Sequence, residues 1–230
     1  MLEAVTNGLP SHVLSASFFD WSGYTCTTVE EGPCTFVSCF APAGLPVVPP
    51  FGAGTIEFSG GAQTVALTPN AQNLYSGGND TQHYFVDGDV VTISATGDAV
   101  PAFSSTLTAP DVVNLTSDQL GAAIDSTSDL LVTWAAGPTE GSLTIMFGAY
   151  TSDATGGTSH NLTCVYDITA GSATVPAAAL QLLPLGNVTF AIESIASELL
   201  MVGEWAVSTR LEAFALYDGL LSAGGTLPLQ

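Results

Sequence analysis

The stretch DLLVTWAAGPTEGSLTIMFGAY, residues 129–150, shows most directly how this chain folds. Apolar side chains at Leu130, Val132 and Trp134 alternate with other residues, which is the period of a half-buried β-strand. A second apolar run, Ser142–Tyr150, follows after a turn that contains Gly and Pro. Two strands joined by a short turn, with no helical period, predict an all-β fold.

The same alternation recurs on both sides of this stretch. Short segments rich in Val, Ile, Thr and Phe are followed by Gly, Pro, Asn or Asp, a spacing typical of β-sandwiches and barrels. We therefore predict one or two antiparallel β-sandwich modules. The other predicted strands are Val13–Trp21, Thr35–Phe40, Gly54–Phe58, Gln63–Thr68, His83–Val86, Asp89–Ala95, Ser104–Thr108, Val112–Leu115, His160–Ile168, Gly171–Val175, Val188–Ser194 and Trp205–Tyr217.

Two local signals complete the predicted fold. Asp87-Gly88 separates two predicted strands and predicts a two-residue hairpin turn, because Gly accepts positive φ without penalty. One short helix is expected near residues 176–183, where Pro176 occupies the first turn, Ala and Leu follow, and Pro184 ends the segment.

We place a domain boundary near Pro110, where two prolines bracket a strand. Residues 1–109 then form an N-terminal β module with a cluster of three cysteines, and residues 110–230 form a second module. In the second module a Trp in an early strand precedes a turn and a long strand. That order resembles fibronectin type III-like and immunoglobulin-like β-sandwich modules.

The charge balance limits the partners. Arg210 is the only Lys or Arg against 21 Asp and Glu, so the net charge is −20. One cation cannot neutralise several phosphates, which argues against nucleic acid, anionic lipid surfaces and phosphorylated substrates. The remaining partners are neutral glycans, apolar surfaces of other surface proteins, copies of the chain itself, and cations such as Ca²⁺. No apolar run is long enough to span a membrane.

Four cysteines, an even number, favour disulfides and therefore an exported protein. Cys34 and Cys39 lie five residues apart, so in a strand they face opposite sides and should not pair with each other. We prefer Cys26–Cys34 around the turn at residues 30–33, together with Cys39–Cys164. The alternatives are Cys26–Cys39 with Cys34–Cys164, or buried free thiols.

A wider resemblance covers most of residues 20–190. The segments that carry it are Cys26, CTFVSC (34–39), AGTIEFSGG (53–61), VALTPNA (65–71), GDVVTISATGDAVPAFSSTLTAP (88–110), DLLVTW (129–134) and LTCVYDITAGSATVPAAALQLLP (162–184). They resemble uncharacterised surface lipoproteins of myxobacterium-like bacteria. The resemblance implies export and anchoring through a lipidated cysteine upstream, but it carries no site residues.

The sequence contains no recognisable catalytic motif. The chain has no GxSxG pentad, and Ser159-His160 near Asp153 and Asp167 is better explained as a polar loop than as a triad. The carboxylate pairs at residues 30/31, 87/89 and 125/129 are more typical of turns than of a glycosidase. We therefore predict that the chain is not an enzyme.

The best candidate metal site is a calcium site formed by Asp80, Asp87 and Asp89, because hard oxygen ligands suit Asp-rich loops. The alternative is that these aspartates only satisfy backbone groups of the turns. No other cofactor is expected.

These observations predict a non-catalytic, acidic structural or binding protein, exported to the cell surface or the extracellular space. The first alternative is a self-assembling subunit of an extracellular fibre or coat. The second is a glycan-binding or glycan-active protein.

Overall fold

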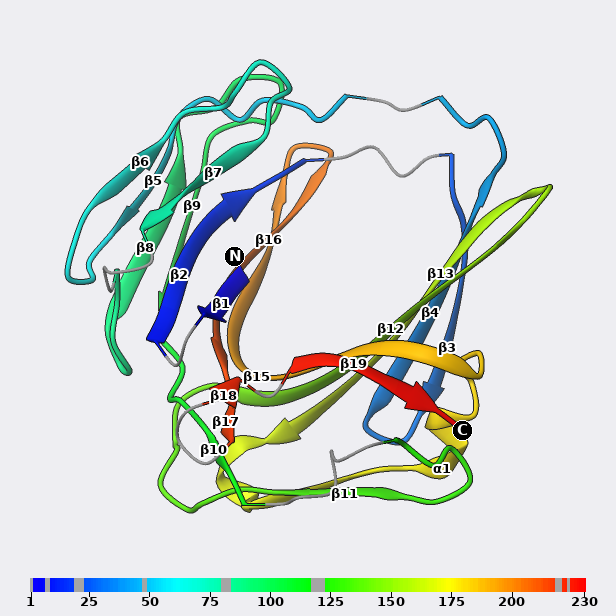
Figure 1. Cartoon of the computed structure of the whole chain (residues 1–230). Coiled ribbons are helices and arrows are strands. Elements are labelled where there is room, and N and C mark those ends of the chain that lie inside the picture. Colours follow the sequence, from blue (N-terminus) through cyan, green and yellow to red (C-terminus); the bar gives the residue numbers. More distant parts are fainter. Residues whose placement is uncertain are drawn as a thin grey trace.

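The computed structural model describes residues 2–6, 9–18, 23–46, 49–79, 84–116, 123–217, 221–222 and 224–230. A seven-stranded antiparallel sheet runs through the centre of the fold, in the order β16-β15-β12-β13-β4-β3, with β19 also paired to β15 (Figure 1). Its strands are β3 (Thr25–Glu31), β4 (Cys34–Pro42), β12 (Ser142–Asp153), β13 (Gly156–Asp167), β15 (Gly186–Val202), β16 (Trp205–Phe214) and β19 (Gly224–Leu229).

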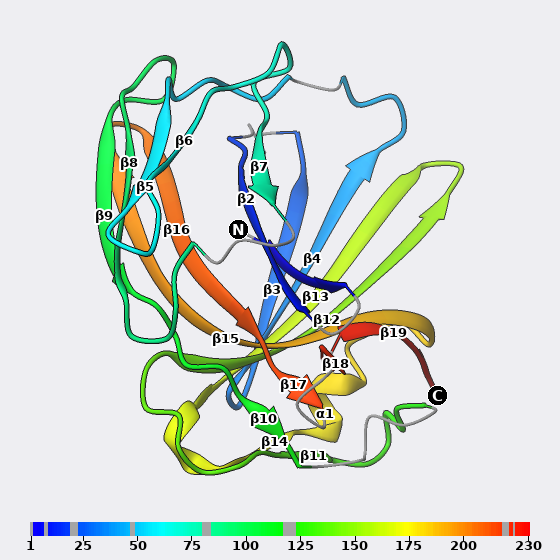
Figure 2. The ribbon, with the colours of Figure 1, turned by 60° about the vertical axis from the view of Figure 1, so that its left-hand side comes forward.

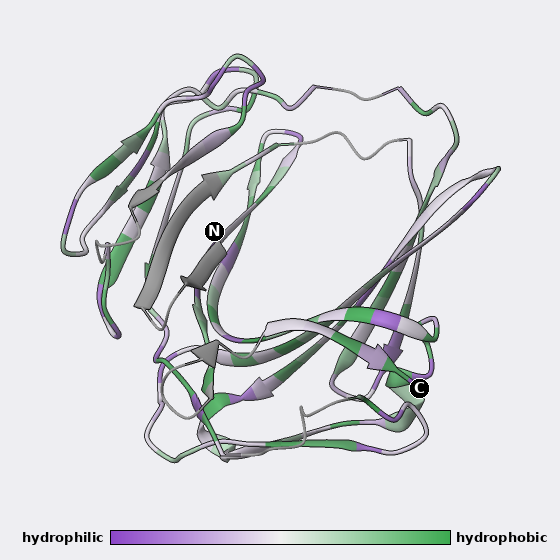
Figure 3. Ribbon diagram, viewed as in Figure 1, coloured by the Kyte–Doolittle hydropathy of each residue, from purple (hydrophilic) through white to green (hydrophobic). Residues whose placement is uncertain are grey.

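A second, four-stranded sheet has the order β6-β5-β8-β9. Its strands are β5 (Ile56–Ser59), β6 (Val65–Leu67), β8 (Val90–Ala95) and β9 (Phe103–Thr108). The strands β5, β8 and β9 have the period-2 burial expected of strands with one buried face, and Figure 3 shows apolar and polar residues interspersed along both large sheets.

Three small sheets complete the structure. They are β1-β2-β7, β10-β17-β18 and β11-β14, with bounds β1 (Leu2–Thr6), β2 (Leu9–Ala16), β7 (Tyr75–Asn79), β10 (Asn114–Leu115), β17 (Leu216–Tyr217), β18 (Leu221–Ser222), β11 (Leu130–Thr133) and β14 (Ser172–Val175). The prediction of an all-β fold with antiparallel sheets is confirmed.

Helix is confined to two short segments in the described part of the chain. The α-helix α1 (Ala177–Leu180) lies inside the predicted segment, with Pro176 as its N-cap residue, and a single 3-10 turn covers Ile168–Ala170. The backbone N–H of Ala177 donates to Oδ1 of Asp129 at 2.8 Å, which satisfies one of the free donors at the start of α1. Among the described residues, no helix is long and apolar enough to cross a membrane.

Strand β15 links two separate cores. Its first half pairs with β12 and β19, and beyond Ile195 it leaves β12 and continues beside β16. The end of β15 and the strand β16 form a hairpin. In Figures 1 and 2 this β15–β16 hairpin rises from the lower sheets toward the four-stranded sheet, where β9 contacts both strands. One long strand therefore belongs to two packed layers.

The first core lies between the middle of the seven-stranded sheet and the β11-β14 pair. Ile145 and Leu162 of the large sheet are fully buried in this core with Trp134. The indole Nε1 of Trp134 donates to the carbonyl oxygen of Ile168 at 2.8 Å. The Trp that the sequence marked as a core residue is thus buried and has a polar partner, as buried indoles usually do.

The second core lies between the four-stranded sheet and the end of the seven-stranded sheet. Ile56 and Phe103 of the smaller sheet pack with Val207 and Leu211 of β16. Leu211 comes from the later half of the chain, and Cys34 of the earlier half lies in the first core. Each core therefore draws on both sides of residue 110, and the domain boundary predicted there stays a prediction.

Most predicted strands are present, with three differences. Of the predicted strand His83–Val86, His83 lies outside the described residues and residues 84–86 are not a strand. The turn at Asp87-Gly88 nevertheless forms: Asp89 N–H donates to the Val86 carbonyl at 3.0 Å and Gly88 has φ +80°. The two strands on either side of the predicted Gly/Pro turn, β11 and β12, are not paired with each other. Strand β11 pairs with β14 in a separate sheet. Strands β1, β3, β7, β18 and β19 were not predicted.

The preferred disulfide pairing is wrong. The structure joins Cys26 to Cys39 and Cys34 to Cys164, which is the alternative pairing. The reason is the tight β3–β4 hairpin: its two-residue loop is Gly32-Pro33, so Cys34 lies opposite Glu31 while Cys26 lies opposite Cys39. In that register Cys26 and Cys34 are five residues apart along the ladder, about 16 Å, which no disulfide spans.

The parity argument for Cys34 and Cys39 is consistent with the structure. Cys34 is fully buried in the first core, and Cys39 lies on the other face of β4, bonded to the exposed Cys26. Within the described chain no cysteine is free.

Candidate binding pocket between the sheets

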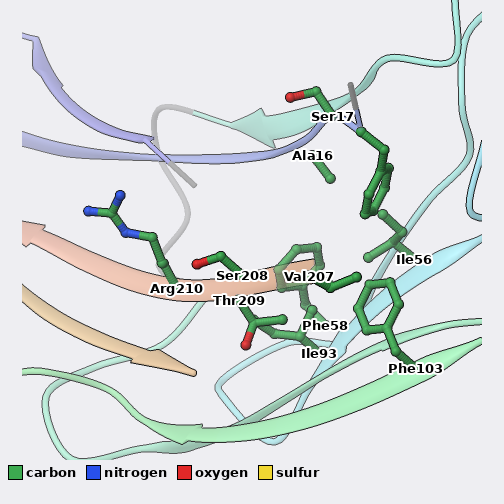
Figure 4. Close-up of a pocket in the computed structure, with 11 residues that line it drawn as sticks. Ala16, Ser17, Ile56, Phe58, Ile93, Phe103, Val207, Ser208, Thr209 and Arg210 are labelled. Carbon is green, nitrogen blue, oxygen red and sulfur yellow. The ribbon is translucent and has the colours of Figure 1, made fainter. Parts of the chain in front are cut away.

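A pocket of about 230 Å³ opens where the end of β2 meets the edge strand β16 and the inner face of the four-stranded sheet (Figure 4). β16 is an outer strand of the seven-stranded sheet, and its residues Val207–Arg210 line the pocket. The apolar lining consists of Ala16, Phe18, Ile56, Phe58, Ile93, Phe103 and Val207, and the polar lining consists of Ser17, Ser208, Thr209 and Arg210.

The apolar wall is built from the second core. Ile56 and Phe103 are buried residues of β5 and β9 whose side chains point inward from a sheet with strict alternation. Phe18 follows β2 and packs its ring edge-on against Phe103 and Tyr75, both at 6.2 Å between ring centroids. The Tyr75 hydroxyl in turn accepts from Ala53 N–H at 2.7 Å. These contacts hold Phe18 in place over the wall.

A polar bridge crosses between the two sheets beside the pocket. The hydroxyl of Thr209 on β16 donates to Ser105 Oγ on β9 at 2.7 Å, and Ser105 donates to Oε2 of Glu198 on β15 at 2.6 Å. Thr209 and Ser105 are buried. Because each buried hydroxyl has a partner, the bridge fixes the separation of the two sheets at the pocket without an unpaired polar group.

Arg210, the only Lys or Arg of the chain, also lines the pocket, but it lies on the opposite face of β16 from Val207 and Thr209, which face the second core. Arg210 Nε is 2.7 Å from Oε1 of Glu212, an ion pair in which the N–H is not aligned for a hydrogen bond. The side chain of Arg210 remains 35% exposed, whereas that of Glu212 is 5% exposed. Arg210 is thus paired with a buried carboxylate, and part of its side chain remains exposed.

A second buried carboxyl group, Glu193, belongs to the same charge cluster. Burial, followed by the nearby Glu212 carboxylate, raises the pKa of Glu193 to about 7, while Arg210 opposes the shift. Burial also raises the pKa of Glu212, again against Arg210. Oε2 of Glu193 is buried and has no hydrogen-bond partner among the described residues, so no hydrogen bond to this oxygen offsets the effect of burial.

This cluster was not predicted from the sequence. The signal available was a glutamate inside each of two strand-forming runs, Val188–Ser194 and Trp205–Tyr217. A glutamate in a half-buried strand points either to solvent or into the protein. The alternation of apolar and polar residues along one strand does not show which face of that strand is covered by another layer, so it does not predict whether the glutamate is buried.

The predicted calcium ligands that are described accept backbone hydrogen bonds, Asp89 within its own turn and Asp87 from a segment outside it. Oδ2 of Asp89 accepts from Val86 N–H at 2.9 Å, and Oδ2 of Asp87 accepts from Val112 N–H at 3.3 Å. Asp80 lies outside the described residues. Among the described His, Cys, Asp and Glu residues no group of three is placed to hold a metal ion. The calcium site stays a prediction.

The other acidic pairs also satisfy backbone and hydroxyl groups. Glu30 accepts from Thr35 Oγ1 at 2.8 Å, Asp125 accepts from Thr127 and Ser128, and Asp129 holds the start of α1. None of these pairs faces the pocket.

The residues considered for a catalytic triad do not form one in the structure. His160 contacts Ser38 Oγ at 3.3 Å through Nδ1 and Thr151 Oγ1 at 3.0 Å through Nε2. Asp153 accepts from the N–H and hydroxyl of Thr155, and Asp167 accepts the same two bonds from Thr169. These bonds lower the pKa of both aspartates, the hydroxyl bond contributing most.

Comparison with known proteins gives little beyond this description. No protein-family model matches the chain, and no curated protein matches it in sequence. Among solved structures it is similar to the fibronectin(III)-like modules of Clostridium thermocellum CbhA, with 15% identity over 91% of this chain and 97% of that one and a TM-score of 0.19. It is also similar to the mouse nectin-like molecule 4 ectodomain (Ig1-Ig3), with 13% identity over 90% of this chain and 67% of that one and a TM-score of 0.14. At these scores neither likeness carries an argument.

Proposed function

We propose that this chain is a non-catalytic, exported structural or binding module of the cell surface or extracellular space. The observation that carries the proposal is the use of the cysteines: all four are joined in two cross-strand disulfides. Disulfides persist in oxidising compartments and are rare in the cytosol.

The placement of the candidate catalytic groups supports the same proposal. His160 and the acidic pairs considered in the sequence are each engaged in bonds within strands and turns. Such groups stabilise loops and hairpins, and no two of them converge on the pocket.

Thiol labelling of protein from its native source tests this proposal. Under denaturing, non-reducing conditions we expect no labelled cysteine, and four labelled thiols would overturn export. A broad hydrolase screen on the same material tests the absence of catalysis. Turnover that survives further purification would contradict it.

The edge of the seven-stranded sheet favours a second candidate, a self-assembling subunit of a fibre or coat. β3 pairs only with β4 among the described strands, and residues 25–30 are all exposed. The strand contains no Pro, Lys or bulge, and its charged residues, Glu30 and Glu31, are confined to the hairpin end, so Thr25–Val29 lacks the features that usually protect an edge. The Cα atoms of Cys26 and Cys39 are 4.1 Å apart, which marks a narrow, non-hydrogen-bonded pair. The backbone groups of Cys26, Thr28 and Glu30 therefore point away from β4, toward an added strand.

Sedimentation velocity tests this second candidate. If β3 pairs with another copy, the intact chain forms larger species as its concentration rises, and Thr28→Pro abolishes them by removing an outward N–H. Thr28→Val, which keeps that N–H, should still assemble. A chain that stays monomeric throughout would contradict assembly through β3.

A further inference from the structure

We propose that β3 pairs antiparallel with β3 of a second copy of this chain, with Thr28 of one copy opposite Thr28 of the other, so that two seven-stranded sheets join into one closed dimer. This inference rests on the second proposed function, assembly through β3, and adds the partner strand, its direction and its register.

The backbone of β3 fixes which residues can face each other across the new contact. Its outward backbone groups are those of Cys26, Thr28 and Glu30, because Cys26 and Cys39 form a non-hydrogen-bonded pair with β4. Two outward residues must be opposite each other to exchange both of their hydrogen bonds. The seven residues of β3 overlap completely with a second copy only where the middle residue faces itself. That register places Thr28 opposite Thr28 and Cys26 opposite Glu30.

The charges of β3 favour the antiparallel direction. Its acidic residues, Glu30 and Glu31, both lie at the hairpin end of the strand, and the rest of β3 carries no charge. A parallel pairing in register would put the carboxylates of both copies side by side, and like charges directly opposite destabilise a sheet. The antiparallel register separates Glu30 of the two copies by about 13 Å along the ladder, at ~3.3 Å per residue. Physiological salt largely screens the repulsion between exposed charges at that separation.

The side chains of β3 also fit a strand of the same sequence. In the antiparallel register Thr27 faces Val29 of the second copy in a non-hydrogen-bonded pair, where side chains lie closest. Residues 25–30 are all exposed, and Val29 is 42% exposed although it is apolar. Because β-branched side chains pack well across strands, the pairing covers an exposed apolar side chain on each copy.

The symmetry of this contact limits it to two copies. The same strand is used on both chains, so no β3 edge remains free once the pair has formed. A fibre or coat built from this chain would need a second contact on another part of its surface. Pairing of β3 with β3 therefore ends at a dimer, whereas pairing of β3 with a different strand would continue to larger species.

Charged pairs placed at residues 27 and 29 of the full chain test the direction and the register, with the dimer dissociation constant measured by sedimentation equilibrium. Thr27→Lys combined with Val29→Glu puts opposite charges across each proposed pair and should tighten the dimer by about fivefold. Thr27→Glu combined with Val29→Lys is the matched control, with the two charges exchanged, and should tighten it equally.

A third variant, Thr27→Lys combined with Val29→Lys, puts like charges across each pair. It should weaken the dimer by about fivefold. Its net charge is less negative than that of the parent chain, so overall repulsion between copies cannot explain the loss. Both substituted positions are exposed, and the melting temperature of each variant shows whether the monomer remains folded.

The pattern across the three variants decides the direction of pairing. Two tighter dimers and one weaker dimer support the antiparallel register. Weakening by all three variants, as parallel pairing requires, or no effect of any of them would overturn that register and leave assembly through β3 in place. Species larger than a dimer that Thr28→Pro abolishes would overturn closure. A chain that stays monomeric would contradict both this inference and the second proposed function.

Discussion

Cys34 and Cys164 lie directly opposite each other on β4 and β13, joined by a disulfide whose Cα atoms are 3.9 Å apart and whose side chains are fully buried. The bond connects positions 130 residues apart in sequence. It therefore ties the cysteine-rich hairpin β3–β4 to the long β12–β13 hairpin in the middle of the large sheet.

The two disulfides should differ in what they contribute to stability. Closing a longer loop removes more entropy from the unfolded chain, so loss of Cys34–Cys164 should cost about 5 kcal/mol and loss of Cys26–Cys39, at a separation of 13, about 3 kcal/mol. The double variants Cys34→Ala/Cys164→Ala and Cys26→Ala/Cys39→Ala are compared by urea unfolding. A smaller loss for the buried pair would contradict the ranking.

Glu193 should make the protein less stable as the pH rises toward neutral. Its pKa of about 7 in the folded protein lies above the ordinary value of 4.5, so the folded state binds more protons than the unfolded chain between those values. The stabilisation is fully present below about pH 4.5 and is lost as the pH rises through about 7.

Glu193→Gln isolates this effect from the rest of the net charge. The variant should lose less unfolding free energy than the parent between pH 5 and pH 8, measured by chemical unfolding at each pH. Glu204→Gln, at an exposed position in the turn between β15 and β16, should keep the slope of the parent. If both variants behave alike, the buried carboxyl group does not titrate as described.

The net charge should make stability depend on salt. With −20 and one cation, the carboxylates repel one another in the compact state, and 0.1 M salt shortens the reach of that repulsion to about 10 Å. The melting temperature should rise from low to moderate NaCl. A flat or falling curve would show that the charges are too dispersed to matter.

Calcium should add little beyond its ionic strength. Asp89 accepts a backbone hydrogen bond within its turn, and Asp87 accepts one from Val112 outside the turn, so each carboxylate already has a structural role. We expect millimolar CaCl₂ and a NaCl control of equal ionic strength to give the same melting temperature. An excess shift that Asp87→Asn abolishes would instead establish the predicted cation site.

The sequence alone predicted the classes of element and most of their positions. Alternation at Leu130, Val132 and Trp134 identified a strand with one buried face, and these three residues are buried as expected. Pro176 and the Ala-Leu run that follows it located the one α-helix of the described chain. Such signals are local, because they depend on the two-residue period of a strand and on the fixed φ of proline.

Pairing was decided only by the tertiary structure. Cys26 faces Cys39 because a two-residue loop at Gly32-Pro33 sets the register of the hairpin, and Cys164 reaches Cys34 because β13 pairs with β4 across 130 residues. Spacing along the chain excluded a bond between Cys34 and Cys39 but could not choose among the remaining partners.

The pocket likewise exists only in three dimensions. By itself the sequence determined an all-β, acidic chain with an even number of cysteines and a single Arg. The tertiary structure decided that Arg210 pairs with Glu212 on one face of β16, and that Phe103 and Ile56, more than a hundred positions earlier, pack in one core with Val207 of its other face. The physical reason is that strand order and register are fixed by the summed burial of both sheet faces, a property of the whole chain that no local pattern contains.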